Sequence, residues 1–558
     1  MLFLNFLFPL LHLSHAASII SRSHSYPLNS HSYTLGPETD LIISNKVIAP
    51  DGFARSATLA GGTFPGPIIS AKKGDKFAIN VVNQLTDDSM LKSTSVHWHG
   101  IYQNRTNYAD GVAFVTQCPI TQNDSFLYSF DAQGQAGTFW YHSHYSTQQC
   151  DGLRGALIIY DSDDPLSYLY DIDDEATVIT LADWYHTVAP ALNHFVTVSA
   201  NSTLINGFGR YAGGPTDTEL AVINVECGKR YRLRIIALSC EPNFVFSIDG
   251  HNLTVIEADG HLTEPLLVDS LRIYAGQRHS VVLNATQPVD NYWIRAFPNT
   301  LYSTFDNRQN MAILRYQGAP VTEPTTNQTT STMPLAENNL HALINPGPPG
   351  IPGYGNADIN LMMIVNKTDG IYYTNGVTFE NPSVPVLLQI LSGAQEAADL
   401  LPKGTVYVVE PNKVVELTMI NGEVRGPHPI HLHGHSFDVV QSTFNSPFNY
   451  VNPVRRDTSY IGLLNQQMVI RWVTDNSGPW LLHCHVDWHL EHGFAVVMAE
   501  SPSDTRKHLN PLPKTQKNLC PTFESLSPSQ VGGVNSYKEA ENLAISLGQN
   551  ITTALFPS

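Results

Sequence analysis

Four short histidine clusters constrain this chain more strongly than any other feature of its sequence. They read HWHG, HSH, HPIHLH and HCHVDWH, and they begin at His97, His142, His428 and His483. In an extended strand, side chains two residues apart share a face, whereas adjacent side chains point to opposite faces. Each His-x-His pair in a strand can therefore present two imidazole rings to one metal site.

The last cluster combines two kinds of metal ligand. In a strand, His483 and His485 would lie on one face and Cys484 on the other. A single strand would then contact two different sites, and the covalent bonds from Cys484 to its two neighbours would offer electrons a short path between them.

The third cluster shows the same alternation. His431 and His433 are two residues apart and share a face, while His428 lies an odd number of residues away. Pro429 can distort the segment, so the alternation supports the placement of His428 on the opposite face without proving it.

The types of ligand indicate the metal. Imidazole nitrogen suits copper and zinc, and a single thiolate beside histidines is typical of a blue-copper electron-transfer centre. We therefore predict a mononuclear copper site formed by Cys484, His428 and His489. The remaining histidines form four His-x-His pairs, too many for one ion, and predict a multinuclear cluster on the opposite side. They are His97, His99, His142, His144, His431, His433, His483 and His485. A single histidine in a strand is more often structural than a ligand, but four such pairs in one chain favour metal binding.

Longer motifs around these clusters carry a family resemblance. HWHGIYQNRTNYADG, GTFWYHSHYSTQQCDGLRG, HPIHLHGHSF and HCHVDWHLEHGF resemble the four copper signatures of fungal laccases, which are three-domain multicopper oxidases, most closely the basidiomycete type. The resemblance extends from about Tyr33 to Cys520. It implies an all-β chain of three cupredoxin-like Greek-key β-sandwich domains. It also implies four copper ions, namely one type 1, one type 2 and two type 3.

The same resemblance implies which histidines bind each copper of the multinuclear cluster. The type 2 copper takes His97 and His431, one type 3 copper takes His99, His142 and His485, and the other takes His144, His433 and His483. The family pattern assigns no metal to His435, which we interpret as structural or as a neighbour of the ligands.

Three further residues are singled out by their place in the motifs. The axial position of the type 1 copper falls on Phe494, whose side chain cannot coordinate, and this implies a three-coordinate copper of comparatively high potential. Glu241 matches the carboxylate of the phenol pocket and is expected to accept the phenolic proton. Asp110 matches an acid that assists proton delivery near the trinuclear cluster. Asp487, inside the last cluster, is interpreted as a neighbour of the ligands or a surface group.

Composition agrees with a β-rich chain. Its 558 residues include 36 prolines and 38 glycines, and only 14% are charged. Segments such as KFAINVVN, SVVLNAT and VVELTMIN are β-branched or alternating and are bounded by turn residues, as in packed antiparallel sheets. We expect domains at residues 33–163, 164–318 and 319–520, followed by a tail at 521–558 that is partly helical at 537–547.

The N-terminal region indicates secretion. Residues 1–17 contain an apolar run of signal-peptide length that ends in small residues, although a basic beginning is missing. No later segment has the uninterrupted apolar length of a membrane span. Eight N-x-S/T sequons fit glycosylation on that route. We therefore expect a secreted, extracellular glycoprotein.

The cysteines fit an oxidising compartment. By resemblance, Cys118 pairs with Cys520 and Cys150 with Cys240, which ties the first domain to the C-terminal region and to the second domain. Cys227 is left over, and we expect it to be a buried free thiol.

The leading hypothesis is a laccase that oxidises phenols or aromatic amines one electron at a time and reduces dioxygen to water. The formal net charge of −18 argues against nucleic acid or anionic membranes as partners, and we expect a monomer. A ferroxidase is the alternative enzyme, but it would need several carboxylates around the type 1 histidines. A copper or electron carrier is a third possibility, and the eight additional histidines argue against it.

Overall fold

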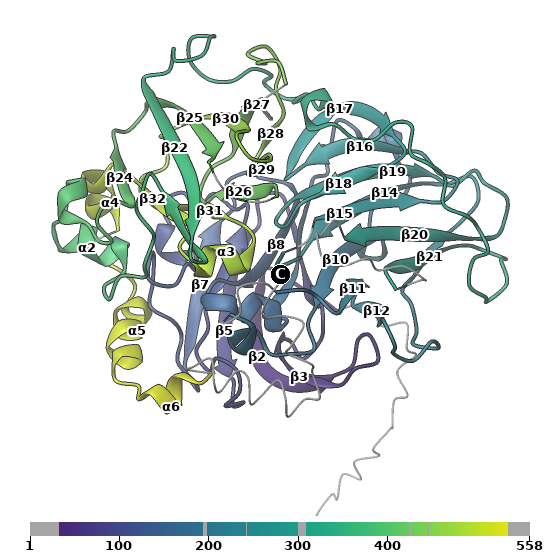
Figure 1. Cartoon of the computed structure of the whole chain (residues 1–558), viewed down its shortest axis with the longest axis horizontal. Helices are drawn as coiled ribbons and strands as arrows, with labels where there is room; N and C mark the ends of the chain where they lie inside the picture. The colour runs from purple at the N-terminus through teal and green to yellow at the C-terminus, as the bar shows by residue number, and fades with distance from the viewer. Residues whose placement is uncertain are drawn as a thin grey trace, which may run out of the picture. The chain divides into compact units, whose positions relative to one another are not determined.

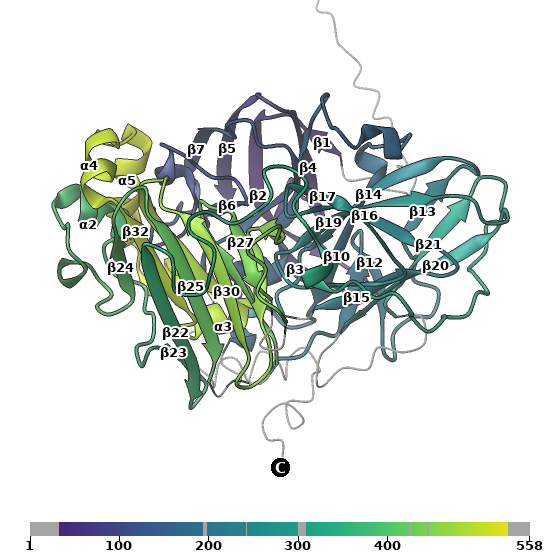
Figure 2. The same cartoon turned by 90° about the horizontal axis from the view of Figure 1, so that it is seen from above.

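The structure is a computed structural model that describes residues 33–193, 198–241, 243–298, 309–422, 424, 426–442, 446–509 and 511–533. The predicted signal peptide at 1–17 and the predicted helical part of the tail at 537–547 lie outside these residues. The described chain is predominantly β-structure, with its strands in six sheets. Each successive third of the chain supplies two of the sheets, which the colours of Figures 1 and 2 separate into purple to blue, teal, and green to yellow.

The first pair of sheets has the strand orders β3-β2-β5-β7 and β1-β4-β9-β8-β6. Its strands are β1 (Thr34–Leu35), β2 (Glu38–Ile48), β3 (Arg55–Ala60), β4 (Gly66–Lys72), β5 (Lys76–Gln84), β6 (Val96–His99), β7 (Ser125–Asp131), β8 (Gly137–Ser143) and β9 (Arg154–Tyr160). The predicted strand KFAINVVN is β5, and it buries Phe77, Ile79 and Val81 on one face, as its alternation predicts.

The second pair has the orders β12-β11-β10-β14-β19-β16-β17 and β13-β21-β20-β15-β18. Its strands are β10 (Val178–Trp184), β11 (Ser202–Ile205), β12 (Phe208–Tyr211), β13 (Val222–Val225), β14 (Arg230–Ala237), β15 (Phe244–Ile248), β16 (Leu253–Ala258), β17 (His261–Val268), β18 (Leu271–Ile273), β19 (Arg278–Asn284), β20 (Asn291–Pro298) and β21 (Met311–Tyr316). The predicted strand SVVLNAT lies mostly in β19.

The third pair has the orders β23-β22-β25-β30-β27-β28 and β24-β32-β31-β26-β29. Its strands are β22 (Ile359–Thr368), β23 (Ile371–Thr374), β24 (Val406–Val409), β25 (Val414–Asn421), β26 (His428–Leu432), β27 (Phe437–Gln441), β28 (Arg455–Arg456), β29 (Thr458–Ile461), β30 (Gln467–Val473), β31 (Gly478–Cys484) and β32 (Ala495–Glu500). The predicted strand VVELTMIN is β25 over its whole length.

Helices are short. The α-helices of the described residues are α1 (Ala189–Leu192), α2 (Val386–Ser392), α3 (Asp487–Glu491), α4 (Pro502–His508), α5 (Lys514–Glu524) and α6 (Pro528–Val531). None of these helices has the length and apolar character needed to cross a bilayer. Cys520, the expected end of the third domain, lies inside α5, so the helix continues into the predicted tail.

Both predicted disulfides are present. Cys118 is bonded to Cys520 and Cys150 to Cys240, as the resemblance implies. The prediction of a buried thiol at Cys227 is wrong, because this side chain is exposed. It lies in the turn between β13 and β14, where the chain reverses at the surface.

The strands that carry the histidine clusters are neighbours in pairs. β6 pairs with β8, which places His97 opposite His142. In the third pair of sheets β26 pairs with β31, which places His431 opposite His483. Both β8 and β31 are completely buried. Four clusters that are far apart in the sequence therefore become two adjacent pairs inside the molecule.

Candidate metal centre

The eight histidines of the four His-x-His pairs form one compact group. Rings from the first and the third pair of sheets lie against one another: the ring centroids of His99 and His431 are 3.8 Å apart, and those of His97 and His433 are 3.9 Å apart. Within each pair, the two rings are also neighbours, as the alternation predicts; the rings of His483 and His485, for example, are 5.5 Å apart. The group therefore lies where the first and last thirds of the chain meet.

Ring nitrogens converge within this group. His433 Nε2 is 3.2 Å from His483 Nε2, and His99 Nδ1 is 3.2 Å from His485 Nε2. Sets of three ring nitrogens lie within 4.8 Å of one another, close enough to share an ion. They include His144 with His433 and His483, His97 with His431 and His433, and His97 with His99 and His142.

Hydrogen bonds orient these rings. Nδ1 of His97 lies 2.7 Å from the carbonyl oxygen of Asp110, and Nδ1 of His431 lies 2.9 Å from that of Asp457. If Nδ1 donates its proton there, Nε2 is left with a lone pair. Among the eight clustered histidines, Nε2 is buried without a hydrogen-bond partner in His97, His142, His144 and His431. Buried acceptors that converge without donors fit a group of metal ions, and nitrogen donors suit copper.

Burial favours the neutral form of most of these rings. Desolvation, and next the neighbouring histidines, lower the pKa of most of these imidazoles well below its usual range, for example in His142 and His433. Desolvation lowers the pKa of His483 to about 3. A neutral imidazole is the form that binds a metal ion.

Two buried carboxylates brace the group. Asp110, predicted from its motif, places Oδ2 3.0 Å from His433 Nδ1, and its Oδ1 lies 3.3 Å from His97 Nδ1. Asp457 was not predicted. Its Oδ1 lies 3.1 Å from His99 Nε2 and 2.7 Å from Nη1 of Arg278. Neither Asp457 nor Arg278 belongs to a histidine cluster, so no spacing in the sequence could have singled them out.

A second group lies on the other side of β31. Cys484 Sγ is 3.5 Å from His489 Nδ1 and 3.8 Å from His428 Nδ1, and these two ring nitrogens are 3.1 Å apart. The three atoms have the chemistry and spacing of a trigonal copper site. The Phe494 ring lies 5.5 Å from that of His428 and is stacked on Tyr372. Phe494 thus borders the site with an apolar face and offers no ligand atom.

The two groups are joined by the chain itself. Cys484 is bonded to His483 and His485, and its carbonyl oxygen accepts a hydrogen bond from His483 Nδ1 at 2.8 Å. The opposite orientation of Cys484 and its neighbours agrees with the predicted strand alternation, even though β31 ends at Cys484.

Glu241 follows β14 and adjoins the helix that carries His489. The backbone N–H of Asp487 in α3 donates to the carbonyl of Cys240 at 2.8 Å. Glu241 is half-buried. Desolvation, and next the negative charge of Asp183, raise the pKa of Glu241 to about 8, while Lys367 opposes them. Such a shift is typical of groups at functional sites.

His435 and Asp487 contact other protein groups. Nε2 of His435 lies 3.2 Å from a carboxylate oxygen of Glu500, and its Nδ1 donates to the carbonyl oxygen of His433 at 3.1 Å, which fits a structural role. Asp487 is buried, with Oδ2 3.0 Å from Cys150 Sγ, so it is not a surface group.

Comparison with known proteins identifies the class. Family models described as multicopper oxidase match residues 42–164, 175–319 and 379–504. A solved laccase from Botrytis aclada is 32% identical, with a TM-score of 0.78 over 91% of this chain and 95% of the other. Fet3p, a multicopper oxidase that functions in iron import, is 28% identical, with a TM-score of 0.76 over 91% of this chain and 98% of the other. The chain belongs to the multicopper oxidase family.

Curated relatives narrow the activity. Laccase-5 of Trametes villosa is 54% identical over 89% of this chain and 95% of the relative, and a laccase of Phlebia radiata is 54% identical over 89% and 96%. The activity is that of a laccase, with phenols and dioxygen as reactants and with one type 1, one type 2 and two type 3 coppers. The ferroxidase alternative is not favoured, since the curated relatives that are 54% identical over most of the chain are laccases.

Proposed function

We propose that His428, Cys484 and His489 hold the type 1 copper and that the eight clustered histidines hold the trinuclear copper site. The observation that carries this assignment is the position of Cys484. Its sulfur faces two imidazole nitrogens, while its chain neighbours belong to the eight-histidine group. Copper in these sites supplies one-electron oxidation of the phenol and four-electron reduction of dioxygen to water.

Within the trinuclear site, we assign the ligands as the family pattern implies. The contact between His433 and His483 and the contact between His99 and His485 each join two proposed ligands of the same type 3 copper. The type 2 copper takes His97 and His431, one type 3 copper takes His99, His142 and His485, and the other takes His144, His433 and His483.

The protein's own acids handle the protons in this proposal. Glu241 accepts the proton that a phenol loses on oxidation, because its raised pKa makes it a better base than an ordinary carboxylate. Asp110 lies against His97 and His433 and assists proton delivery at the trinuclear site. Phe494 leaves the type 1 copper three-coordinate, which favours a high potential.

Further features of the proposal concern the whole protein. The domains extend over residues 33–163, 164–318 and 319–520, with a tail at 521–558. Residues 1–17 act as a signal peptide, and the enzyme is an extracellular monomer that also accepts aromatic amines. An acidic chain with a charge of −18 fits small aromatic substrates better than polyanions.

The assignment is tested with Cys484→Ser in the copper-loaded protein. A serine hydroxyl does not supply the thiolate that blue copper sites require. The blue absorption and the oxidation of 2,6-dimethoxyphenol should both disappear, while copper at the trinuclear site largely persists. The measurements are the visible spectrum, the copper content per chain and dioxygen uptake.

Cys227→Ser is the matched control, because it removes the other free thiol of the described residues and should keep the colour and activity. Retained blue absorption in Cys484→Ser would refute the assignment. Dioxygen uptake with ferrous iron but not with the phenol, in the unaltered protein, would overturn the phenol-oxidising role.

A further inference from the structure

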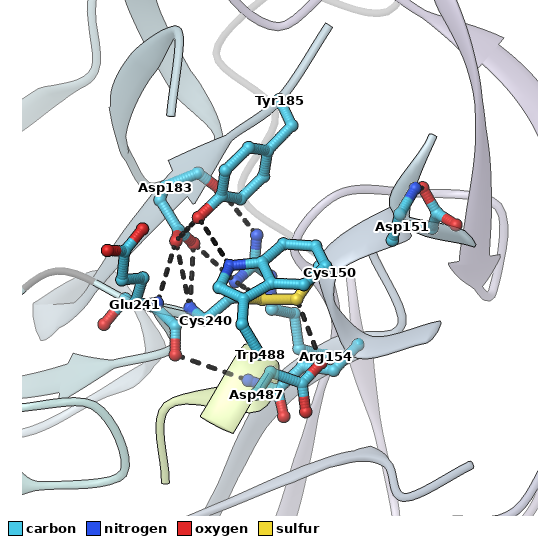
Figure 3. Close-up of a disulfide and its surroundings, with 12 residues drawn as sticks. Cys150, Asp151, Arg154, Asp183, Tyr185, Cys240, Glu241, Asp487 and Trp488 are labelled. Carbon is cyan, nitrogen blue, oxygen red and sulfur yellow. Dashed lines mark hydrogen bonds and ion pairs between the residues drawn. A yellow bond between two sulfur atoms is a disulfide. The ribbon is translucent and has the colours of Figure 1, made fainter. Parts of the chain in front are cut away.

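Asp183 occupies a buried position next to Glu241 that the reaction outlined above does not use. It is the penultimate residue of β10 and is completely buried. Its carboxylate accepts hydrogen bonds from the backbone N–H groups of Cys240, at 2.9 and 3.1 Å, and of Glu241, at 3.1 Å. Figure 3 shows these bonds converging on one side chain. Asp183 therefore holds the backbone from which the Glu241 side chain extends.

The carboxylate of Asp183 is itself held by two other groups. Nη1 of Arg154, a fully buried residue of β9, donates to Oδ1 at 3.0 Å. The Tyr185 hydroxyl donates to Oδ2 at 2.7 Å. Charge-assisted bonds of this kind are stronger than neutral ones, and the site is shielded from water. Asp183 is thus a rigid anchor.

Two connections lead from Asp183 to the helix that carries His489. The first passes through Cys240, whose N–H bonds Asp183 and whose carbonyl accepts the N–H of Asp487, the first residue of α3. The second passes through Tyr185, whose hydroxyl lies 3.4 Å from Trp488 Nε1. Figure 3 shows both connections. The same carboxylate therefore relates the position of Glu241 to the residues that immediately precede His489.

The geometry points to Asp183 as a positioning residue for phenol oxidation, which holds Glu241 in register with His489. The inference rests on the proposed role of Glu241 as the group that accepts the phenolic proton. Oriented groups contribute to a rate only while their mutual geometry is kept. Loss of Asp183 should therefore impair the oxidation of donors that release a proton and spare those that release only an electron.

The charge of Asp183 has a second effect on the same carboxyl group. Desolvation raises the pKa of Glu241 most, and Asp183 raises it further. Lys367 faces Glu241 from β22 and opposes both effects, and Tyr372 and Tyr185 are the phenolic groups that interact with the Glu241 charge. Removing the negative charge of Asp183 should therefore lower the pKa of Glu241.

The test is Asp183→Asn in the copper-loaded enzyme, which keeps the shape of the side chain and removes its charge. The substrates are 2,6-dimethoxyphenol, which loses a proton on oxidation, and ferrocenemethanol, a neutral donor that loses only an electron. We expect the maximal kcat/KM for the phenol to fall about tenfold, the effect of one lost bond to a charged group. The rising limb of its pH profile should move to lower pH. The kcat/KM of the Asp183→Asn enzyme for ferrocenemethanol should stay within about twofold of the value for the unaltered enzyme.

Asp249→Asn is the matched control. Asp249 is also a buried aspartate of the middle third, but its carboxylate bonds to Arg295, at 2.7 Å, and to Thr326 rather than to Glu241 or α3. It should leave the ratio of phenol to ferrocenemethanol turnover unchanged. If Asp183→Asn does not fold, Tyr185→Phe is tested in its place. This variant should lower kcat/KM for the phenol about threefold, because one weaker hydrogen bond to Asp183 is lost. The rising limb of the pH profile should not move, because no charge is removed.

Equal losses with both donors, or an unchanged phenol profile, would overturn the role of Asp183. Glu241→Gln, alone and combined with Asp183→Asn, distinguishes a failure of the role of Asp183 from a failure of the proposed role of Glu241. If Glu241→Gln alters the phenol profile and Asp183→Asn alone does not, only the inference about Asp183 fails. If Glu241→Gln itself has no effect, the proton-accepting role of Glu241 fails as well. When both roles hold, the Glu241→Gln enzyme lacks the rising limb, and adding Asp183→Asn leaves the shape of its pH profile unchanged.

Discussion

Glu241 differs from an ordinary surface carboxylate because of what surrounds it. It is half-buried, and desolvation together with the charge of Asp183 raises its pKa to about 8. As the pH rises through this pKa, Glu241 loses its proton and becomes able to accept one from a phenol. In the proposed mechanism, the rate of phenol oxidation is therefore coupled to the ionisation of Glu241.

We predict that kcat/KM for 2,6-dimethoxyphenol increases with pH through the pKa of Glu241 in the unaltered enzyme. Glu241→Gln should abolish this rising limb and lower the value above the pKa by roughly a hundredfold, the low end of the effect of a general base, because water can also accept the proton. Steady-state kinetics across the pH range measure both effects. An unchanged limb would assign the proton to another acceptor.

The motif around Cys240 pointed to Glu241 but not to its surroundings. A glutamate next to a cysteine can be located by its place in a motif, whereas its pKa depends on Asp183 and Lys367, which are distant in sequence. The choice of Glu241 as a candidate site residue was therefore possible from the sequence, whereas the surroundings that set its pKa could not be predicted.

At the level of elements, the turn between β18 and β19 approaches the proposed metal centre closely. Gly276 lies in this turn with φ of +85°, and a Cβ built there would lie 2.7 Å from Cδ2 of His485 and 3.1 Å from Cε1 of His99. Glycine allows both the positive φ and the close approach. The middle third of the chain supplies no histidine to the proposed sites, yet this turn forms part of their wall.

We predict that Gly276→Ala displaces His485 and His99 and lowers the copper content below four per chain. The blue absorption should persist, because Cys484 faces the opposite side of β31. Copper analysis and the visible spectrum of the same sample provide the measurement.

Gly318→Ala is the control for backbone strain. Gly318 has φ of +95°, but the nearest atom to its built Cβ is 3.6 Å away. Both substitutions strain the backbone by about 1 kcal/mol, so only contact with the ligands distinguishes them. Full copper occupancy in Gly276→Ala would show that the histidines adjust to the methyl group.

Among the properties of the strands, the face on which each side chain lies was the most predictable. Alternation alone placed the faces of β5 and of the histidine pairs correctly, because side-chain direction in a strand is local. The pairing of β6 with β8 and of β26 with β31 was not predictable in this way, because register depends on the partner strand.

At the level of the whole molecule, Arg278 connects all three thirds of the described chain. It belongs to β19, bonds both carboxylate oxygens of Asp457 at 2.7 Å, and donates from Nε to the carbonyl of Thr138 in β8 at 2.9 Å. Asp457 in turn contacts His99. The buried side chain of Arg278 therefore links the three thirds of the chain to one another and, through Asp457, to the group of eight histidines.

We predict that Arg278→Met destabilises the protein by ~3–5 kcal/mol, the cost of leaving a buried charge without its partner. It should also reduce the copper content, since Asp457 loses its anchor beside His99. Thermal unfolding and copper analysis test the two effects separately.

Arg295→Met is the comparison for this prediction. It breaks a buried pair with Asp249 that lies within the middle third. A similar loss of stability with normal copper content is expected. Equal copper contents in the two variants would mean that Arg278 stabilises the fold without supporting the metal centre.

Sequence alone determined which residues can bind copper and which faces of their strands they occupy. Both properties follow from side-chain chemistry and from the two-residue repeat of a strand. They therefore depend only on the sequence immediately around residues such as His97, His142, His431 and Cys484. Tertiary structure decided how these local pairs meet and what holds them. Asp457, Arg278 and Asp183 act through contacts with residues far away in the chain, and such contacts exist only once the sheets have packed, because burial creates both the close distances and the low-dielectric surroundings that give these charges their effect.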